Sequence, residues 1–284
     1  MSSNNSQTLN TDKPTISFIG AGNMASSLVG GMINDGWPSD KITISDPNRD
    51  RREQILARYP VHSTDNNNVA CQNADLVVLA VKPQILKEVC ISLNPAIQQK
   101  KPLLVSIAAG IREVDISRWL GGNVSVVRCM PNTPALVGSG VSGLFANSLV
   151  TEKQKSLAEN ILRSVGVTLW LSEESLLDSV TALSGSGPAY IFLVIEALQQ
   201  AGIKLGLSEK SARLLAIETT FGASKMALES SESPERLRHK VTSPGGTTEC
   251  ALEVLQCGGL VELFESALQA AKQRSVELAD KLGA

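Results

Sequence analysis

Residues 15–25 read Thr15-Ile-Ser-Phe-Ile-Gly-Ala-Gly-Asn-Met-Ala25, and this stretch decides the fold of the first half of the chain. An apolar, β-branched run ends in a Gly-x-Gly-x-x-Ala turn, and a helical pattern follows directly. In this strand–turn–helix context such a turn binds a dinucleotide pyrophosphate. Gly20 permits the tight turn, Gly22 lets the backbone approach a ligand, and Ala25 allows close packing of helix on strand. The alternative is a bare glycine turn without a ligand.

Short β-like runs alternate with helical patterns as far as about residue 171. Strands are expected at Thr15–Ile19, Ile42–Ser45, Leu76–Val81, Leu103–Ile107, Val124–Arg128 and Gly166–Leu171. Helices are expected at Asn23–Asp35, Arg49–Arg58, Arg112–Leu120 and, behind a capping box at Thr151, to about Ser164. This alternation predicts βαβ units and a doubly wound sheet of the α/β class.

Helical patterns dominate the second half of the chain. They cover Leu176–Leu183, Pro188–Leu205, Ser208–Glu229 and Leu260–Leu282. We therefore predict a polar, disordered N-terminus at 1–13, a dinucleotide-binding domain of the Rossmann type at 14–172, and an all-helical domain at 173–284. The run Pro188–Leu205 is apolar nearly all round, so we expect a helix of a second chain to cover it.

Composition excludes several classes of function. The formal net charge of the 284 residues is −2, which disfavours a nucleic-acid partner. The two histidines and five cysteines form no metal-ligand spacing, and the cysteines suit reduced thiols in the cytoplasm. The longest plain apolar run, Ala189–Ile195, is far shorter than a membrane span, and the N-terminus lacks a signal pattern. We expect a cytoplasmic protein without a metal or a membrane partner.

The ends of two further strands are expected beside the glycine turn. Asp46 ends the second strand, where an acidic residue usually binds the ribose of NAD, whereas the nearby Arg49 suits the 2′-phosphate of NADP. The arginines at 49, 51 and 52 are equally typical of a solvated helix start. Lys82 leaves the apolar strand at the ligand-binding edge of the sheet, and it is as consistent with a solvent-exposed loop lysine as with a cofactor contact.

A second candidate site begins at Ser243-Pro-Gly-Gly-Thr-Thr248, ahead of a helical pattern. Such a turn exposes consecutive backbone N–H groups at a helix start, which bind a carboxylate without a basic side chain. Ordinary N-capping by Thr247 or Thr248 is the simpler interpretation, and the local sequence alone favours it.

Together these stretches closely resemble the pyrroline-5-carboxylate reductase family from about Ile16 to the C-terminus. The matching segments are Phe18–Met24, Ala80–Pro83, Val105–Gly110, Met130–Pro134, Ala182–Tyr190, Gly222–Met226 and Ser243–Thr248, in the expected order and spacing. Any one of these motifs is weak by itself, whereas the set is highly specific.

The resemblance implies reduction of 1-pyrroline-5-carboxylate to L-proline by NADP(H), with NAD(H) as the possible alternative. It implies a C-terminal helical dimerisation domain, a homodimer and a decamer of five dimers. Thr248 would hydrogen-bond the substrate ring nitrogen. The substrate-binding residues expected are Ser243, Gly245, Gly246, Thr247 and Thr248. The cofactor-binding residues expected are Gly20, Gly22, Asn23, Met24, Asp46, Asn48, Arg49, Asn67, Ala80, Val81, Lys82 and Pro83.

Two other functions share part of this sequence pattern. A β-hydroxyacid dehydrogenase also has a glycine turn and a helical second domain, but it uses a Lys with an Asn four residues later on a second-domain helix. No Asn follows Asn160 in this chain. A non-catalytic dinucleotide sensor would need no second small-molecule site, and the turn at Ser243–Thr248 argues against one.

Overall fold

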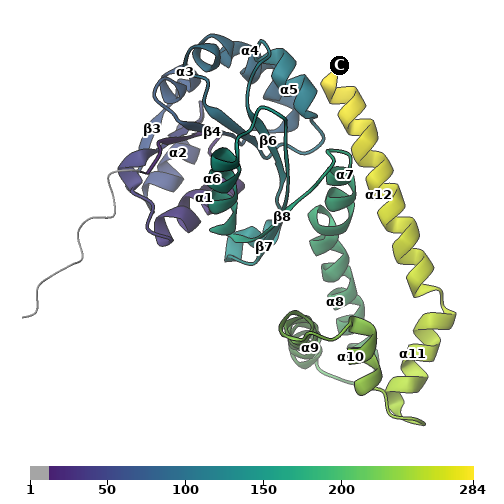
Figure 1. The fold of residues 1–284 in the computed structure, drawn as a ribbon. Coiled ribbons are helices and arrows are strands. Elements are labelled where there is room, and N and C mark those ends of the chain that lie inside the picture. The colour runs from purple at the N-terminus through teal and green to yellow at the C-terminus, as the bar shows by residue number, and fades with distance from the viewer. Residues whose placement is uncertain (1–12) are drawn as a thin grey trace, which may run out of the picture. The chain divides into compact units, whose positions relative to one another are not determined.

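The computed structural model describes residues 13–284, so the predicted disordered stretch 1–13 lies outside it except for Lys13. The chain forms two compact units (Figure 1). Unit 1 runs to Gly185 and also includes Ala271–Ala284, and unit 2 is Ser186–Ala270.

Unit 1 is built on an eight-stranded sheet with the order β3-β2-β1-β4-β5-β6-β7-β8. The strands are β1 (Ile16–Ile19), β2 (Ile42–Ser45), β3 (His62–Thr64), β4 (Leu76–Leu79), β5 (Leu103–Ser106), β6 (Val126–Met130), β7 (Gly140–Ala146) and β8 (Gly166–Trp170). Strands β1, β2, β4, β5 and β6 pair in parallel, as expected of βαβ units, and β3 also pairs in parallel with β2. Strand β7 is antiparallel to β6 and parallel to β8. The carboxyl ends of β1, β2 and β4 therefore lie side by side.

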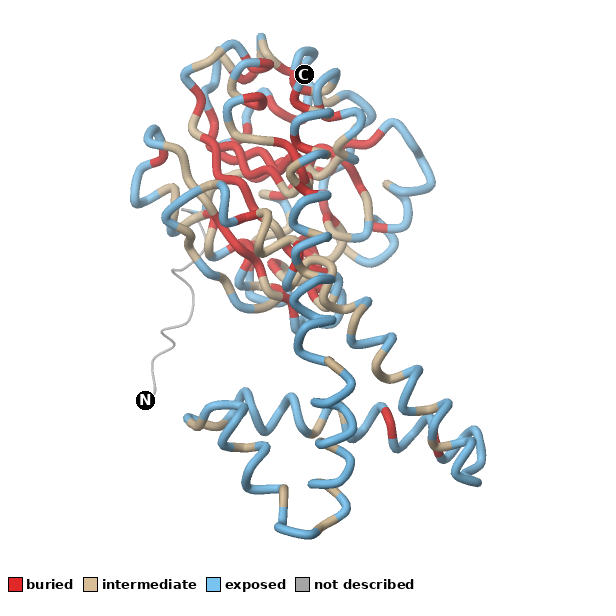
Figure 2. The backbone as a smooth tube through the Cα atoms, turned by 90° about the vertical axis from the view of Figure 1, so that its right-hand side faces the viewer, coloured by how far each residue is buried: buried red, intermediate tan, exposed pale blue. Residues whose placement is uncertain are grey.

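Helices cover both faces of this sheet. They are α1 (Asn23–Asn34), α2 (Arg49–Leu56), α3 (Asn67–Cys71), α4 (Pro83–Lys100), α5 (Glu113–Trp119) and α6 (Glu152–Arg163), with short turns η1 (Ser39–Lys41) and η2 (Thr133–Val137). Alternate strand residues supply two separate cores, because successive side chains point to opposite faces. Ile16 and Phe18 pack with α1 and α6, and Ile19 packs with α4 and α5. The buried residues concentrate in these strands (Figure 2).

Several elements of the sheet domain are absent from the sequence-based prediction, namely β3, β7, α3, α4 and the short turns η1 and η2. Strand β3 has only three residues, and β7 contains two glycines, so neither shows a strong strand pattern. No helix is expected after Lys82, but Pro83 is the first residue of the 18-residue helix α4. A proline fits there, because the first helical N–H needs no intrahelical partner.

The packing of unit 1 extends beyond the domain boundary predicted at residue 172. Helix α7 (Leu176–Val180) and the π-helical turn η3 (Thr181–Gly185) follow β8. Leu177 and Ala182 are about 2% exposed, and a Cβ on Gly143 of β7 would lie 2.9 Å from the Val180 side chain. The change from strands to helices thus precedes the end of the compact unit.

Unit 2 contains α8 (Gly187–Lys204), α9 (Glu209–Glu229), α10 (Pro234–Lys240), α11 (Thr247–Cys257) and the first part of α12 (Leu260–Gly283). Helices α8 and α9 pack through Gly202 and Ala212. No residue of α8 is buried, and Phe192 and Leu193 are 68% and 65% exposed. By length and composition alone, the stretch Leu176–Lys204 would also suffice to cross a membrane. The apolar side chains of α8 are therefore largely exposed in a single chain.

Candidate active site

The glycine turn joins β1 to α1 and leaves space for a ligand. Gly20 has a φ of +104°, and a Cβ there would lie 2.7 Å from the Ala80 carbonyl oxygen, so only glycine fits. Gly22 is the N-cap of α1, and a Cβ on it would meet no atom within 4 Å. The start of α1 therefore has open space beside Gly22, as close approach of a pyrophosphate to the backbone requires.

The residues that follow β2 are held tightly around this turn. The Asp46 carboxylate accepts hydrogen bonds from the backbone N–H groups of Ala21 and Asn48, both at 2.9 Å. Asn48 caps α2 by accepting from the Arg51 N–H at 3.2 Å. Arg49 is far more open, because its side chain is 79% exposed and pairs only with Glu53, 2.6 Å away.

Two other predicted cofactor-binding segments reach the same sheet edge. Asn67 opens α3, and its Oδ1 accepts a hydrogen bond of 2.7 Å from the Ser45 hydroxyl of β2. Ala80 follows β4 and donates its N–H to the Ile19 carbonyl of β1 at 2.8 Å. Val81 comes next, and the exposed Lys82 is the N-cap of α4. The parallel register thus brings the ends of β1, β2 and β4, with Asn67 of α3, to one edge of the sheet.

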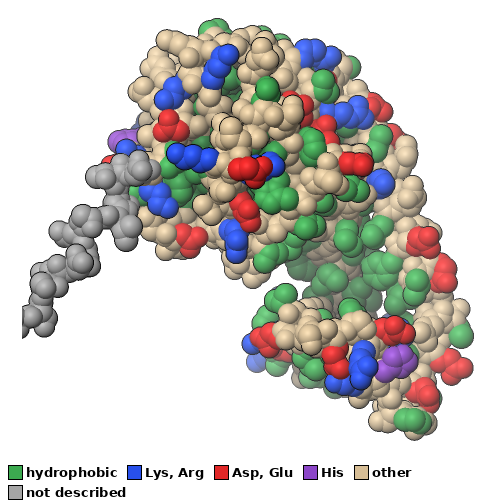
Figure 3. All heavy atoms as spheres, viewed as in Figure 1, with side chains coloured by type: hydrophobic (Ala, Val, Ile, Leu, Met, Phe, Trp, Pro, Cys, Tyr) green, Lys and Arg blue, Asp and Glu red, His purple; other side chains and the backbone are tan. Residues whose placement is uncertain are grey.

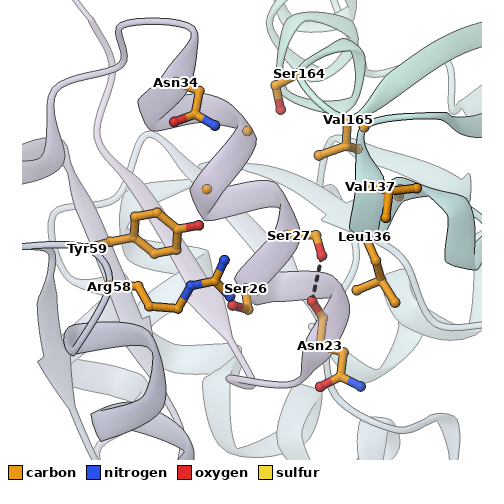
Figure 4. A pocket seen from close by; sticks show the side chains of 14 residues that line it. Asn23, Ser26, Ser27, Asn34, Arg58, Tyr59, Leu136, Val137, Ser164 and Val165 are labelled. Carbon is orange, nitrogen blue, oxygen red and sulfur yellow. Dashed lines mark hydrogen bonds between the residues drawn. The ribbon is translucent and has the colours of Figure 1, made fainter.

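A groove of about 390 Å³ runs along the outer side of α1 from Asn23 to Asn34 (Figure 4). Arg58 and Tyr59 lie on one side of it, and Leu136 and Val137 of η2 lie on the other. Among the residues that line this groove, only Asn23 is a site residue expected from the sequence. The sequence feature that indicates this groove is the adjacent pair Gly30 and Gly31 inside a helix, where glycine is normally unfavourable. Side chains on both would collide with Tyr59 and Ser164.

Asn132 lies in the family-matching segment Met130–Pro134 but is not among the site residues expected from the sequence. Its side chain is buried, donates to the Ser184 carbonyl at 3.1 Å and accepts from the Val141 N–H at 2.9 Å. Asn132 therefore ties the loop after β6 to β7 and to η3. A buried amide with both ends satisfied stabilises one loop conformation.

The second candidate site is the start of α11 in unit 2. Gly245 has a φ of +71°, and its N–H donates to the Glu249 carboxylate at 2.7 Å. Gly246 is the N-cap, and its N–H donates to the Ser243 carbonyl at 2.9 Å. Among the described residues, the hydroxyls of Thr247 and Thr248 make no capping hydrogen bond. The turn thus already binds one carboxylate oxygen through its backbone, and threonine N-capping is absent.

The cysteine thiols of unit 1 have little nucleophilic character. Burial raises the pKa of Cys71, Cys90 and Cys129 to about 12, with a hydrogen bond to Ser142 opposing the effect at Cys129. A thiol with such a pKa is fully protonated at neutral pH. These three thiols are therefore unsuited to act as nucleophiles at the glycine-turn site.

Comparisons with known proteins point to one family. Residues 174–278 match the family described as pyrroline-5-carboxylate reductase dimerisation, and residues 15–110 match NADP oxidoreductase coenzyme F420-dependent. The chain is 50% identical to the pyrroline-5-carboxylate reductase of Pseudomonas aeruginosa, over 95% of this chain and 98% of that one.

Two solved structures are similar over nearly the whole length. A pyrroline-5-carboxylate reductase from Coxiella burnetii superposes with a TM-score of 0.91 at 47% identity, covering 94% of this chain and 99% of the other. The pyrroline carboxylate reductase of Plasmodium falciparum, solved with NADP bound, gives 0.83 at 29% identity, with coverages of 94% and 99%.

Proposed function

The chain belongs to the pyrroline-5-carboxylate reductase family, and on that premise we propose which residues hold its cofactor and its substrate. The enzyme is an NAD(P)-dependent oxidoreductase of proline biosynthesis that reduces 1-pyrroline-5-carboxylate to L-proline. Its dimerisation segment also makes it a homo-oligomer.

The glycine turn of unit 1 is proposed to hold NADP(H), with NAD(H) as an alternative. The space in front of Gly22 and the first-turn amides of α1 fit a pyrophosphate, and the exposed Arg49 suits a 2′-phosphate. The residues proposed to contact the cofactor are Gly20, Gly22, Asn23, Met24, Asn48, Arg49, Asn67, Ala80, Val81, Lys82 and Pro83, while Asp46 lies behind the turn and accepts from the Ala21 N–H. Bound NAD(P)H supplies the hydride for the reduction.

The start of α11 is proposed to bind the substrate. The observation that supports this proposal is the hydrogen bond of 2.7 Å from the Gly245 N–H to the Glu249 carboxylate, because it pairs a backbone amide of the turn with a carboxylate oxygen. The backbone of Gly246 to Thr248 would take the substrate carboxylate, and Ser243 would complete the turn. The hydroxyl of Thr248, which caps nothing in the described chain, would bond the ring nitrogen.

These few groups suffice for the chemistry. A protonated cyclic imine is already an electrophile, so it needs neither a nucleophile nor a strong general acid. The protein must hold the imine carbon against the nicotinamide, at about 3–3.5 Å in a reactive geometry. It must also exclude water and orient the imine nitrogen. Thr248 is the side chain proposed for that last task.

We further propose that the homo-oligomer is a homodimer formed through α8, assembled as a decamer. Phe192 and Leu193 are more than 60% exposed in one chain, and unit 2 buries few apolar residues itself. A partner chain would cover this surface in a large obligate interface. It would also account for the hydropathy of the Leu176–Lys204 stretch without a membrane. Sedimentation should find no active, folded monomer at micromolar concentration.

A cytoplasmic location is proposed as well. All five cysteines are free thiols in the structure, and three of them are buried. Reduced thiols are typical of the cytosol. A fusion of the full chain to a fluorescent protein, followed by cell fractionation, tests this location directly.

The activity assay measures oxidation of NADPH, and separately of NADH, after 1-pyrroline-5-carboxylate is added. Turnover with at least one cofactor, with proline as the product, is the expected result. A protein that binds the cofactor but consumes none of it would be a sensor, and the proposed roles of α11 would then be wrong.

A further inference from the structure

We infer that Asp46 is a positioning residue for the dinucleotide turn and makes no direct hydrogen bond to the cofactor ribose. The inference rests on the proposed function, since it assumes that the glycine turn holds the cofactor. An acidic residue at the end of the second strand ordinarily accepts from the ribose 2′-hydroxyl and disfavours NADP. The surroundings of Asp46 favour a different role.

Both oxygens of the Asp46 carboxylate already have backbone partners. One oxygen accepts from the Ala21 N–H and the other from the Asn48 N–H, each at 2.9 Å. The residue is 5% exposed, so little of its surface is open to a ligand. A buried carboxylate held by two amides cannot turn toward a ribose without leaving both N–H groups unpaired.

The negative charge of Asp46 is also balanced locally. Arg51 Nη1 lies 3.7 Å from one carboxylate oxygen, and Arg52 Nη1 donates to the Asp46 carbonyl at 2.5 Å. With two guanidinium groups beside it, the carboxylate repels a nearby phosphate less than an unpaired carboxylate would. The charge of Asp46 is therefore a weak reason to expect NAD rather than NADP.

What Asp46 does instead is join two loops. Gly20 N–H donates to the Ser45 carbonyl at 2.7 Å, and the next amide, Ala21, donates to Asp46. These consecutive bonds fix the turn at the point where its amides must face the pyrophosphate. Through the Asn48 N–H, Asp46 also fixes the start of α2, which carries Arg49.

This role predicts a specific pattern of cofactor affinities. Loss of the carboxylate should loosen the pyrophosphate cradle, which NADPH and NADH share. Both dissociation constants should therefore rise by similar factors, on the order of 10-fold. A residue that bonds the ribose hydroxyl would instead weaken NADH selectively and leave NADPH unchanged or improved.

The test measures binding of NADPH and of NADH to the full-length oligomer by fluorescence titration, together with KM and kcat. Asp46→Asn keeps the shape and one acceptor, and Asp46→Ala removes both acceptors. We expect both Kd values to rise together, the NADPH/NADH ratio to stay within about threefold, and kcat at saturating cofactor to stay near the parent value. If the Ala variant does not fold, the Asn variant alone decides.

Asp50→Asn is the matched control. Asp50 is an exposed residue of the first turn of α2, so its replacement makes the same charge change nearby without touching Ala21 or Asn48. Its effect on both Kd values should stay within about twofold, the size expected of an exposed charge.

Three results would overturn the inference. They are a loss confined to NADH, a loss confined to NADPH, and unchanged affinity for both in a folded Asp46→Asn variant. A parent enzyme that binds neither dinucleotide would overturn the proposed function and this inference together. If the inference alone is wrong, the parent enzyme still binds a dinucleotide and still reduces 1-pyrroline-5-carboxylate, so the two failures can be told apart.

Discussion

Ser275 Oγ donates a hydrogen bond of 2.6 Å to the Asp178 carboxylate, although 97 positions separate the two residues. Ser275 is only 5% exposed and belongs to the end of α12 that packs within unit 1. Arg112 and Asp280 add an ion pair of 2.6 Å between α12 and the turn before α5, and the hydrogen bond to Asp280 raises the pKa of Arg112. The last residues of the chain are therefore part of the sheet domain. Figure 3 shows charged and hydrophobic side chains interspersed on one face of the molecule.

The first prediction concerns this contact. Ser275→Ala should lower the free energy of unfolding by about 1.5–3 kcal/mol, because a partly buried carboxylate loses a hydrogen-bond donor. Thermal or urea unfolding of unit 1 checks it. Ser117→Ala is the control, since Ser117 lies in α5 and its hydroxyl has no partner among the described residues. An equal loss of stability in both variants would contradict the prediction.

The second prediction separates catalysis by Thr248 from a structural role. Thr248→Val keeps the branched shape and removes only the hydroxyl, so kcat/KM for pyrroline-5-carboxylate should fall by about 10- to 100-fold. Thr248→Ser should retain most of the activity. Stability and NADPH affinity should barely change, because the helix cap is Gly246 and not this threonine.

The matched control for that experiment is Thr247→Val, one residue earlier and exposed. Only its backbone is proposed to contact the substrate, so its kcat/KM should stay within about threefold of the parent. The proposed role of Thr248 is falsified if a folded Thr248→Val variant works at the parent rate.

The third prediction tests whether Arg49 binds the 2′-phosphate of NADPH. Arg49→Ala should weaken NADPH more than NADH, by about 10-fold in the ratio of Kd values, because only NADPH carries the extra phosphate. Its ion pair with Glu53 is highly exposed, so little stability should be lost. Arg58→Ala, beyond the end of α2, should leave the ratio unchanged. Equal losses of both cofactors in Arg49→Ala would show that Arg49 does not recognise the phosphate.

The fourth prediction concerns acid stability. Partial burial of Asp75 opposes ionisation, but hydrogen bonds from the Thr15 N–H and hydroxyl, together with Lys100 at 3.2 Å, lower its pKa in the folded state. A depressed carboxyl pKa adds stability above the unfolded pKa, near 3.9, and this stability disappears as the pH falls through the folded value. Because the side chain is about half exposed, we expect a contribution of about 1 kcal/mol or less.

Urea unfolding of the parent and of Asp75→Asn between pH 7 and pH 3 measures this contribution. The difference in unfolding free energy should be constant near neutrality and shrink toward pH 3. Asp40→Asn, at an exposed position of η1, is the control and should show no such convergence. A difference that grows on acidification would contradict the sign of the pKa shift.

The local sequence determined the parts of the fold that depend on backbone conformation and short-range pattern. Gly20 must be glycine because of its left-handed φ, and the apolar run before it must be a buried strand. The parallel direction of β1, β2 and β4 then follows from the alternation of strands and helices. The carboxyl ends of these strands therefore lie at one edge of the sheet.

Other features depend on contacts that no local window contains. The antiparallel β7 gains its pairing from β6 and β8, and its glycines make room for Val180 of α7. The compact unit continues past residue 172 for the same reason, since Leu177 and Ser275 are buried by residues distant in the chain.

The sites show the same division. Sequence motifs located both the glycine turn and the turn at Ser243–Thr248, because each needs particular residues at fixed spacing. The sequence around Asp46 was consistent with a preference for either NAD or NADP. The sequence around Thr248 was consistent with either an N-cap or a substrate-binding residue. Only the folded chain gave the Asp46 carboxylate two backbone donors and made Gly246 the helix cap. Hydrogen-bond partners are decided by tertiary geometry, and composition and spacing cannot supply them.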